Sequence, residues 1–274
     1  MRTWYDGIHP VSLLPLPWSG LDPHTVTYAQ KNEMSTRFLA SVSNLEEAAT
    51  ILAAGADIID IKDPGKGALG AVQPVVVKQI VKYISGQVMN SATIGDLPME
   101  ATCISNAIGN MQATGVDIIK IGVFADFVTA DILQVIKRFT DSGCRVVLVY
   151  FADLKPRLED FSALADAGIH GVMLDTADKS NGNLRTILGD NELESFVQAA
   201  QAAGLMTGLA GSLQQRDIKP LLDLKPDLLG FRSALCIRHQ RKMHIDVNAV
   251  NQIRSMIPLA DRHLVKRSTM IQEV

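Results

Sequence analysis

Residues 55–64 of the chain read Gly-Ala-Asp-Ile-Ile-Asp-Ile-Lys-Asp-Pro, and this stretch decides the fold. A β-branched run bounded by glycine and proline is typical of a buried strand in a parallel sheet. Because side chains alternate along a strand, Ile59 and Ile61 lie on one face and Asp60 and Lys62 on the other. Burying charged groups costs free energy unless they are compensated. The pair is therefore either an ion pair that only stabilises the fold or part of a functional site, and the rest of the chain favours the functional interpretation.

The alternation of apolar strands and amphipathic helices continues along the chain. We expect eight strands, at residues 37–42, 57–62, 88–94, 117–122, 145–150, 170–175, 205–210 and 227–231. We expect eight helices between and after them, at residues 44–54, 72–84, 99–113, 128–140, 157–167, 190–203, 214–222 and 246–256. This α/β pattern predicts a single (β/α)8 TIM barrel over residues 37–257. A doubly wound open sheet is the main competitor, but no Gly-x-Gly-x-x-Gly opens a helix after a strand.

Both ends of the chain differ from this regular pattern. Residues 1–36 contain four of the eleven prolines and both tryptophans, Trp4 and Trp18, and they show neither a helical nor a strand period. We interpret them as an irregular N-terminal extension, either disordered or packed over the barrel. Residues 258–274 are interpreted as a polar C-terminal tail.

Composition excludes several classes of function. A net charge of −3 gives no electrostatic reason to expect a nucleic-acid partner. Residues 1–18 lack the apolar run of a signal peptide, and no apolar run reaches the ~20 residues of a membrane helix. The three cysteines, Cys103, Cys144 and Cys236, have neither metal-ligand nor redox spacing. We therefore expect a cytoplasmic homo-oligomer that has a small-molecule substrate and binds neither nucleic acid nor membrane.

Charged residues recur at the ends of the even-numbered strands. The second strand ends in Asp60 and Lys62, the fourth ends near Lys120, and the sixth ends in Asp175, with Lys179 four residues beyond it. The catalytic groups of a TIM barrel lie at the C-terminal ends of its strands, and alternate strands share layers of its interior. These side chains are therefore expected to converge at the barrel mouth. Any single lysine at such a position could instead be solvated and without function.

Clustered lysines and carboxylates favour one class of chemistry. The pKa of an amine is lowered when other amines lie close to it, and also when its surroundings are apolar. A lysine that is neutral at the working pH attacks carbonyl carbons and forms a Schiff base. Asp60 and Asp175 are placed to transfer protons or to orient the amines. This is the equipment of a class I aldolase, in which the iminium supplies the electron sink, so we expect neither a metal nor an organic cofactor.

The segments after the last two strands carry a second signal. The seventh strand is followed by Gly211 and Ser212, and the eighth contains Gly230 and is followed by Arg232. The segments after strands seven and eight form the usual phosphate site of this fold, built from backbone N–H groups. Glycine permits close approach of the backbone, serine donates a hydrogen bond and arginine supplies charge. We predict that these four residues bind phosphate, the alternative being two ordinary tight turns.

Two weaker signals lie outside this pattern. Asp153 follows the fifth strand and either faces the barrel mouth or begins the next helix. His239 and His244 are five residues apart, which is not a recognised metal-binding spacing, and we expect both at the surface.

Taken together, these motifs resemble the (5-formylfuran-3-yl)methyl phosphate synthases. The resemblance extends in order over residues 37–256, and its matching stretches are residues 55–62, 67–71, 92–96, 119–122, 173–179 and 209–212. It implies a TIM barrel that joins two molecules of glyceraldehyde 3-phosphate, with loss of one phosphate and two waters. The implied product is 4-(hydroxymethyl)-2-furancarboxaldehyde phosphate, a precursor of methanofuran or a bacterial analogue in C1 metabolism.

The resemblance also implies roles for individual residues. Lys62 corresponds to the lysine that forms the Schiff base, and Asp60 and Asp175 to its acid and base partners. Lys120 and Lys179 correspond to the other essential amines, which polarise carbonyl groups or bind phosphate.

The chain departs from the family pattern at three places. Residues 63–66 read Asp-Pro-Gly-Lys where an Asn-Pro dipeptide is expected, and Lys66 there either adds a phosphate contact or lies idle in a loop. The N-terminal extension and the C-terminal tail are the other two departures. Two alternative functions stay open: another Schiff-base aldolase or isomerase acting on a phosphorylated sugar, and a non-catalytic barrel that binds a phosphorylated ligand. Measuring furan absorbance with glyceraldehyde 3-phosphate as the only substrate distinguishes these three functions.

Overall fold

The computed structural model describes residues 35–156, 161–178 and 181–259. The predicted extension and nearly all of the predicted tail lie outside these residues, so the domain boundaries remain predictions. Residues 157–160, at the start of the predicted fifth helix, and residues 179–180 also lie outside them. Within the described part, no helix is long and apolar enough to cross a membrane.

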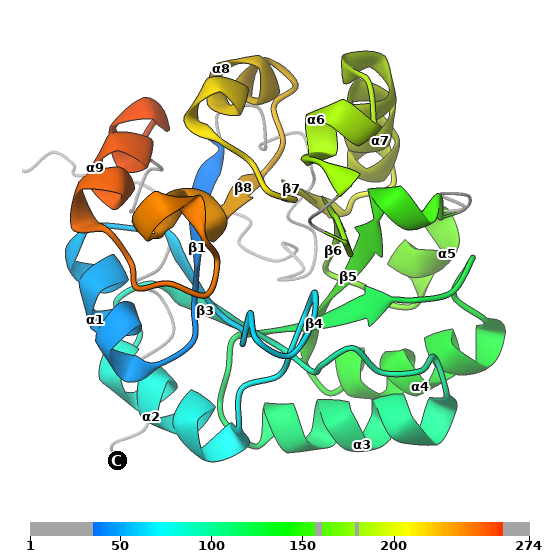
Figure 1. Ribbon diagram of the computed structural model, residues 1–274. Helices are drawn as coiled ribbons and strands as arrows, with labels where there is room; N and C mark the ends of the chain where they lie inside the picture. Colours follow the sequence, from blue (N-terminus) through cyan, green and yellow to red (C-terminus); the bar gives the residue numbers. More distant parts are fainter. Residues whose placement is uncertain (1–34, 157–160, 179–180, 260–274) are drawn as a thin grey trace, which may run out of the picture. The chain divides into compact units, whose positions relative to one another are not determined.

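Within the described ranges, eight parallel strands close into a barrel, in which β8 pairs back onto β1 (Figure 1). The strands are β1 (Arg37–Val42), β2 (Ile58–Ile61), β3 (Met89–Thr93), β4 (Ile118–Val123), β5 (Arg145–Phe151), β6 (Gly171–Asp175), β7 (Met206–Leu209) and β8 (Leu228–Phe231). Every predicted strand is present. The predicted TIM barrel is confirmed, and the open doubly wound sheet is excluded.

Helices surround the strands, as Figure 1 shows. Those of the described residues are α1 (Leu45–Ala53), α2 (Pro74–Ile84), α3 (Ala101–Gln112), α4 (Ala130–Thr140), α5 (Phe161–Asp166), α6 (Leu184–Ile187), α7 (Asp190–Ala202), α8 (Gln215–Asp223) and α9 (Val247–Met256). The sequence did not indicate α6, because four residues are too few to show a helical period. This helix begins where the side chain of Asn183 accepts a hydrogen bond from the N–H of Thr186.

Alternation along β2 separates two apolar layers. Ile59 and Ile61 point outward and belong to the cluster between the barrel and its helices. Ile58 points inward and packs with apolar residues of β4, β5 and β6 inside the barrel. Asp60 and Lys62 follow Ile58 at intervals of two residues, so they lie on the interior side, nearer the C-terminal end of the strand. The barrel therefore places charged groups over an apolar floor.

Carboxylates recur at the N-terminal end of the barrel. One aspartate stands directly before each of β2, β4 and β8, and its side chain accepts a backbone N–H from the preceding strand. The donor–acceptor pairs are Phe38 with Asp57, Asn90 with Asp117, and Thr207 with Asp227, at 2.8, 2.9 and 2.7 Å. These contacts fix the starts of neighbouring strands, on the barrel face that contributes to stability rather than to catalysis.

Replacing Asp117 by Ala should destabilise the fold without changing turnover. The backbone N–H of Asn90 and its side-chain Nδ2, 2.9 and 2.6 Å from Asp117, would both lose their acceptor. An unpaired buried donor costs about 1–3 kcal/mol. Urea denaturation measures the loss. The control is Asp141→Ala, which removes an exposed ion pair with Lys137 and should cost less than about 1 kcal/mol. Equal losses in the two variants would contradict the role of Asp117.

Candidate active site

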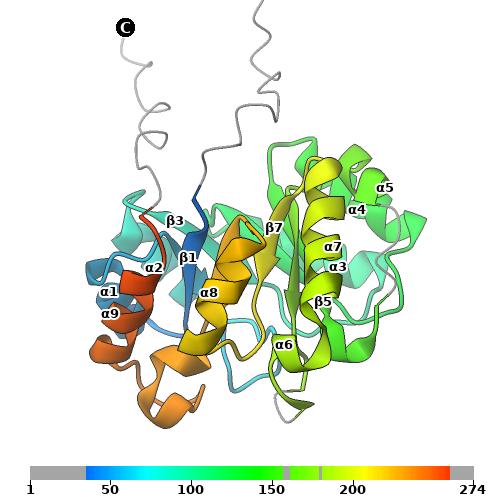
Figure 2. The same cartoon turned by 90° about the horizontal axis from the view of Figure 1, so that it is seen from above.

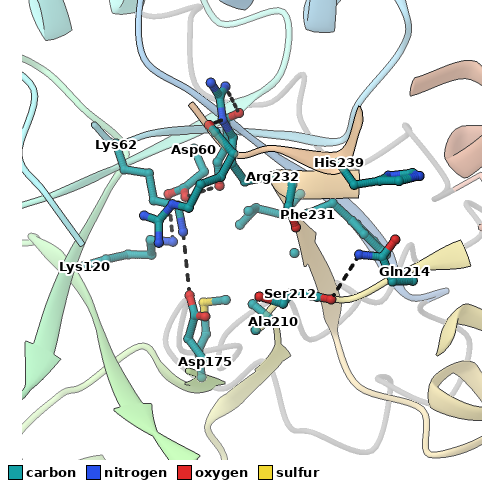
Figure 3. A pocket seen from close by; sticks show the side chains of 17 residues that line it. Asp60, Lys62, Lys120, Asp175, Ala210, Ser212, Gln214, Phe231, Arg232 and His239 are labelled. Carbon is teal, nitrogen blue, oxygen red and sulfur yellow. Dashed lines mark hydrogen bonds and ion pairs between the residues drawn. The ribbon is translucent and has the colours of Figure 1, made fainter. Parts of the chain in front are cut away.

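Strands β2, β4 and β6 bring four charged side chains to one cavity of about 280 Å³. Asp60, Lys62, Lys120 and Asp175 are all buried. Nζ of Lys120 lies 2.7 Å from Oδ1 of Asp60, and Nζ of Lys62 lies 3.6 Å from Oδ2 of Asp175 (Figure 3). The cavity therefore contains two amine–carboxylate pairs, contributed by three strands that are not neighbours in the sheet.

Asp60 is 0% exposed and has three close donors. Oγ of Ser91 donates to its Oδ1 at 2.7 Å, Oγ of Ser41 donates to its Oδ2 at 2.9 Å, and Lys120 contacts Oδ1. Burial raises the pKa of a carboxyl group, but the charges of Lys120 and Lys62 and the hydrogen bond from Ser91 outweigh it here. The pKa of Asp60 is therefore below its ordinary value. The group is ionised at neutral pH and is a poor proton donor there.

Lys120 is the more enclosed of the two lysines. Burial is the largest cause that lowers its pKa, and the charge of Lys62 lowers it further. Asp60 and Asp175 act in the opposite direction, but the pKa of Lys120 remains below its ordinary value. Its amine is thus easier to deprotonate than that of an exposed lysine, although the contact with Asp60 restrains its movement.

Lys62 has more freedom than Lys120. Its 3.6 Å separation from Asp175 is longer than a hydrogen bond, and its side chain is 9% exposed, against 4% for Lys120. Oδ1 of Asp175 accepts the backbone N–H of Thr176 at 2.7 Å, while Oδ2 faces Lys62. Lys62 is therefore the amine better placed to reach a molecule in the cavity.

The segments after β7 and β8 form another wall of the cavity. In Figure 3, Ser212 and Gln214 lie across the cavity from Lys120. Gly211 (φ 105°) and Ser212 (φ 53°) have left-handed backbone conformations. A Cβ on Gly211 would lie 3.0 Å from the side chain that follows β6, and the positive φ is strained for other residues, so this position favours glycine. Gly230 also lines the cavity, and the phosphate contact of these residues stays a prediction.

Arg232 lines the cavity as well, but its hydrogen-bonding capacity is used elsewhere. Nη1 and Nη2 donate to the carboxylate of Glu47 at 2.7 and 3.0 Å. The other three N–H groups have backbone oxygens as acceptors, on Ser41, Arg241 and Met243. A guanidinium has five N–H donors. Arg232 therefore joins α1 to the segment after β8, and its phosphate contact stays a prediction.

Two carboxylates fix the segments at the barrel mouth. Asp96, after β3, accepts the backbone N–H groups of residues 68–69 at 2.8 and 2.7 Å. Asp153, after β5, accepts those of residues 177–178, both at 2.7 Å. The sequence left open whether Asp153 faces the barrel mouth, and these contacts place its carboxylate there. Lys179 lies outside the described residues, and its role stays a prediction.

The sequence did not indicate Ser41, Ser91 or Arg241 as part of the site. Ser41 and Ser91 stand directly beside Asp60 in the register of β1 and β3, and strand alignment could have found them. Arg241 lines the cavity from the irregular connection between β8 and α9, where no periodic pattern could have indicated it. His239 is exposed, as expected, and also lines the cavity.

Comparison with known sequences identifies the family. The profile of the 4-HFC-P synthase family matches residues 38–254, nearly the whole barrel. The chain belongs to the 4-HFC-P synthase family. It is therefore an enzyme of the (5-formylfuran-3-yl)methyl phosphate synthase type.

Relatives in this family match the chain over most of its length. The (5-formylfuran-3-yl)methyl phosphate synthase of Methanothermobacter thermautotrophicus is 33% identical over 233 residues, which cover 80% of this chain and 98% of the relative. The synthase of Methanobrevibacter smithii is 34% identical over 220 residues, covering 75% and 93%. A Methylorubrum extorquens protein, to which the same name is given provisionally, is 41% identical over 216 residues, covering 79% and 89%.

Solved structures share the fold with little sequence identity. A 3-hexulose-6-phosphate synthase has a TM-score of 0.59 at 15% identity, covering 81% of this chain and 100% of its own. The phosphoribosyl anthranilate isomerase of Thermus thermophilus has a TM-score of 0.59 at 15% identity, covering 81% and 98%. At this identity the likeness supports the barrel fold alone.

Replacing Asp60 by Asn should leave Lys120 as a buried charge without its carboxylate, at a cost of about 3–5 kcal/mol. The pKa of Lys120 would fall still further below that of the unfolded chain. The unpaired charge then costs most at low pH, and the loss shrinks as pH rises through the pKa of Lys120 in the folded state. Urea denaturation at pH 7 and pH 9.5 measures both effects.

Two further variants control this prediction. Ser91→Ala keeps the ion pair and removes one donor, so it should cost only about 1 kcal/mol. Asp60→Asn combined with Lys120→Met removes both charges and should recover part of the loss. If the double variant is less stable than Asp60→Asn alone, an unpaired lysine is not the cause.

Proposed function

We propose that this enzyme condenses two molecules of glyceraldehyde 3-phosphate through a lysine Schiff base. The proposed product is 4-(hydroxymethyl)-2-furancarboxaldehyde phosphate, which is formed when two triose phosphates lose one phosphate and two waters. The observation that carries the proposal is the presence of two buried amine–carboxylate pairs in one cavity. The names of the relatives in methanogens support the furan product.

Lys62 is the proposed nucleophile. Attack on a carbonyl carbon needs a neutral amine that can turn its lone pair to the substrate. The amine of Lys62 is more than a hydrogen-bond distance from Asp175, whereas that of Lys120 is bound to Asp60 at 2.7 Å. The lowered pKa of Lys120 argues for the opposite assignment. The modified lysine must therefore be identified directly, in the experiment described below.

The two carboxylates are proposed to have different tasks. Asp175 faces Lys62, so it is placed to take a carbon-bound proton after condensation and to give it to the hydroxyl group that leaves during dehydration. Asp60 has a lowered pKa and stays ionised. Its proposed task is to balance the charges of Lys120 and of the iminium, rather than to supply protons as the sequence suggested.

The wall across the cavity from the lysines is the proposed site for the phosphate of the first triose. Gly211 and Ser212 line this wall, and their left-handed backbone allows the main chain to approach a ligand closely. Segments after strands seven and eight of this fold bind phosphate through backbone N–H groups. A triose phosphate could then reach from this wall to Lys62.

Borohydride reduction tests the Schiff base. With glyceraldehyde 3-phosphate present, it should add a reduced triose to the peptide that contains Lys62, and the untreated enzyme should develop furan absorbance from this substrate alone. Lys62→Met should lose both signals. An adduct confined to Lys120 would assign the nucleophile there. The absence of adduct and of absorbance would instead favour another phosphorylated sugar or a non-catalytic barrel.

Replacing Asp175 by Asn should let the carbon–carbon bond form and then stop the reaction before aromatisation, because the leaving hydroxyls lack their proton donor. Mass spectrometry should show a six-carbon adduct without furan absorbance. Asp166→Asn changes an exposed carboxylate on α5 in the same way and should leave product formation intact. If Asp175→Asn forms no adduct at all, Asp175 acts before condensation and its assignment as a late acid is wrong.

A further inference from the structure

The proposed reaction brings two phosphate groups into one cavity, and the inference below rests on that proposed function. A phosphate monoester carries close to two negative charges at neutral pH. The cations already described at the cavity contact carboxylates: Lys62 with Asp175, Lys120 with Asp60, and Arg232 with Glu47. The second phosphate therefore needs a cation whose charge is not already compensated.

Arg241 meets this requirement. It lines the same cavity, and its side chain is partly exposed. Its Nη2 donates to the backbone oxygen of Gly67 at 2.7 Å, and the structure shows no carboxylate of a described residue in ion-pair contact with it. A guanidinium has five N–H donors. One hydrogen bond to an uncharged oxygen leaves both the charge and most of the donors of Arg241 available to a ligand.

The position of Arg241 is fixed at both ends of its side chain. Its backbone oxygen accepts Nε of Arg232 at 2.8 Å. The backbone beside Gly67 is fixed in turn, because Asp96 accepts the next two N–H groups. A long side chain loses less entropy on binding when its surroundings already restrict it. Arg232 therefore acts as a positioning residue, and Arg241 is the arginine whose charge is available to a ligand in the cavity.

Arg241 lies toward the lysine side of the mouth. Burial, the largest cause, lowers the pKa of Arg241, while the charges of Asp175, Asp96 and Asp63 act against it. The acceptor of its Nη2, the backbone oxygen of Gly67, lies in the segment after β2, whereas Gly211 and Ser212 follow β7. The hydrogen-bonded end of Arg241 therefore lies beside a different segment of the mouth. Figure 2 shows the segment between β8 and α9 at the same end of the barrel as α6. Two anionic groups could thus bind in the cavity without sharing one set of donors.

We propose that Arg241 binds the phosphate group of the second triose phosphate, at a subsite separate from the wall formed by Gly211 and Ser212. The first triose is joined to Lys62, with its phosphate at that wall. The second enters over it, from the mouth, and its phosphate contacts the guanidinium beside Gly67. Arg241 thereby orients the second carbonyl for condensation.

Phosphate titration tests the subsite without requiring chemistry. Calorimetry with inorganic phosphate should show two bound ions per chain for the wild type and one for Arg241→Gln. The control Arg238→Gln makes the same change at an exposed residue outside the cavity and should keep two. Equal urea midpoints for the two variants would show that both are folded. One bound ion in the wild type, or two in Arg241→Gln, would overturn the proposal.

Kinetics then separate the first triose from the second. For Arg241→Gln, half-maximal furan formation should need about 10- to 100-fold more glyceraldehyde 3-phosphate, as expected for the loss of a charged hydrogen bond. The concentration that gives half-maximal borohydride trapping of a single triose on Lys62 should stay unchanged. If trapping shifts equally, Arg241 binds the first triose and the assignment fails. A wild type that binds two phosphates but traps no triose would refute the Schiff base and still support the subsite.

Discussion

The barrel interior depends on the contact between Asp60 and Lys120. Two hydroxyl groups, from Ser41 and Ser91, complete the surroundings of this carboxylate, so a single group connects β1, β2, β3 and β4 inside the barrel. Each member of such a network is costly when it is buried alone and is compensated only when the others are present. The charges of the site are therefore oriented by the protein rather than by water, as electrostatic catalysis requires.

The two lysines differ in how they are restrained. Lys120 is bound to an ionised carboxylate within the interior, whereas Lys62 stands at the end of its strand, with a longer contact and more exposure. A fixed amine supplies a constant field, and a less restrained amine can approach and leave a carbonyl carbon. The difference arises from the positions of the two lysines along their strands. Both side chains point into the barrel, but Lys62 follows the last residue of β2, whereas Lys120 lies within β4.

Much of the fold and half of the site followed from sequence, for identifiable reasons. β-branched runs between glycines indicated the strand positions. The alternation of side chains along each strand then indicated which charged residues point into the barrel at the strand ends: Asp60, Lys62, Lys120 and Asp175. The ion pair of Arg232 with Glu47 was not predicted, because the two residues lie 185 positions apart in the chain. Local sequence carries no trace of such a pairing. Arg241 was not predicted for a related reason. It lies in an irregular connection, and its place depends on tertiary contacts rather than on a periodic pattern of apolar residues.

The carboxylates at the barrel mouth bear on how such barrels exchange parts during evolution. The segment after β2 relies on Asp96, which belongs to the next βα unit, and the segment after β6 relies on Asp153, which belongs to the preceding one. A single βα unit transplanted into a relative would leave its acceptor behind. A chimaera joined between β4 and β5 would retain both of these acceptors, but it would take Arg232 and Glu47 from different parents. The parts of this mouth that must be inherited together are therefore pairs of adjacent βα units, the second with the third and the fifth with the sixth.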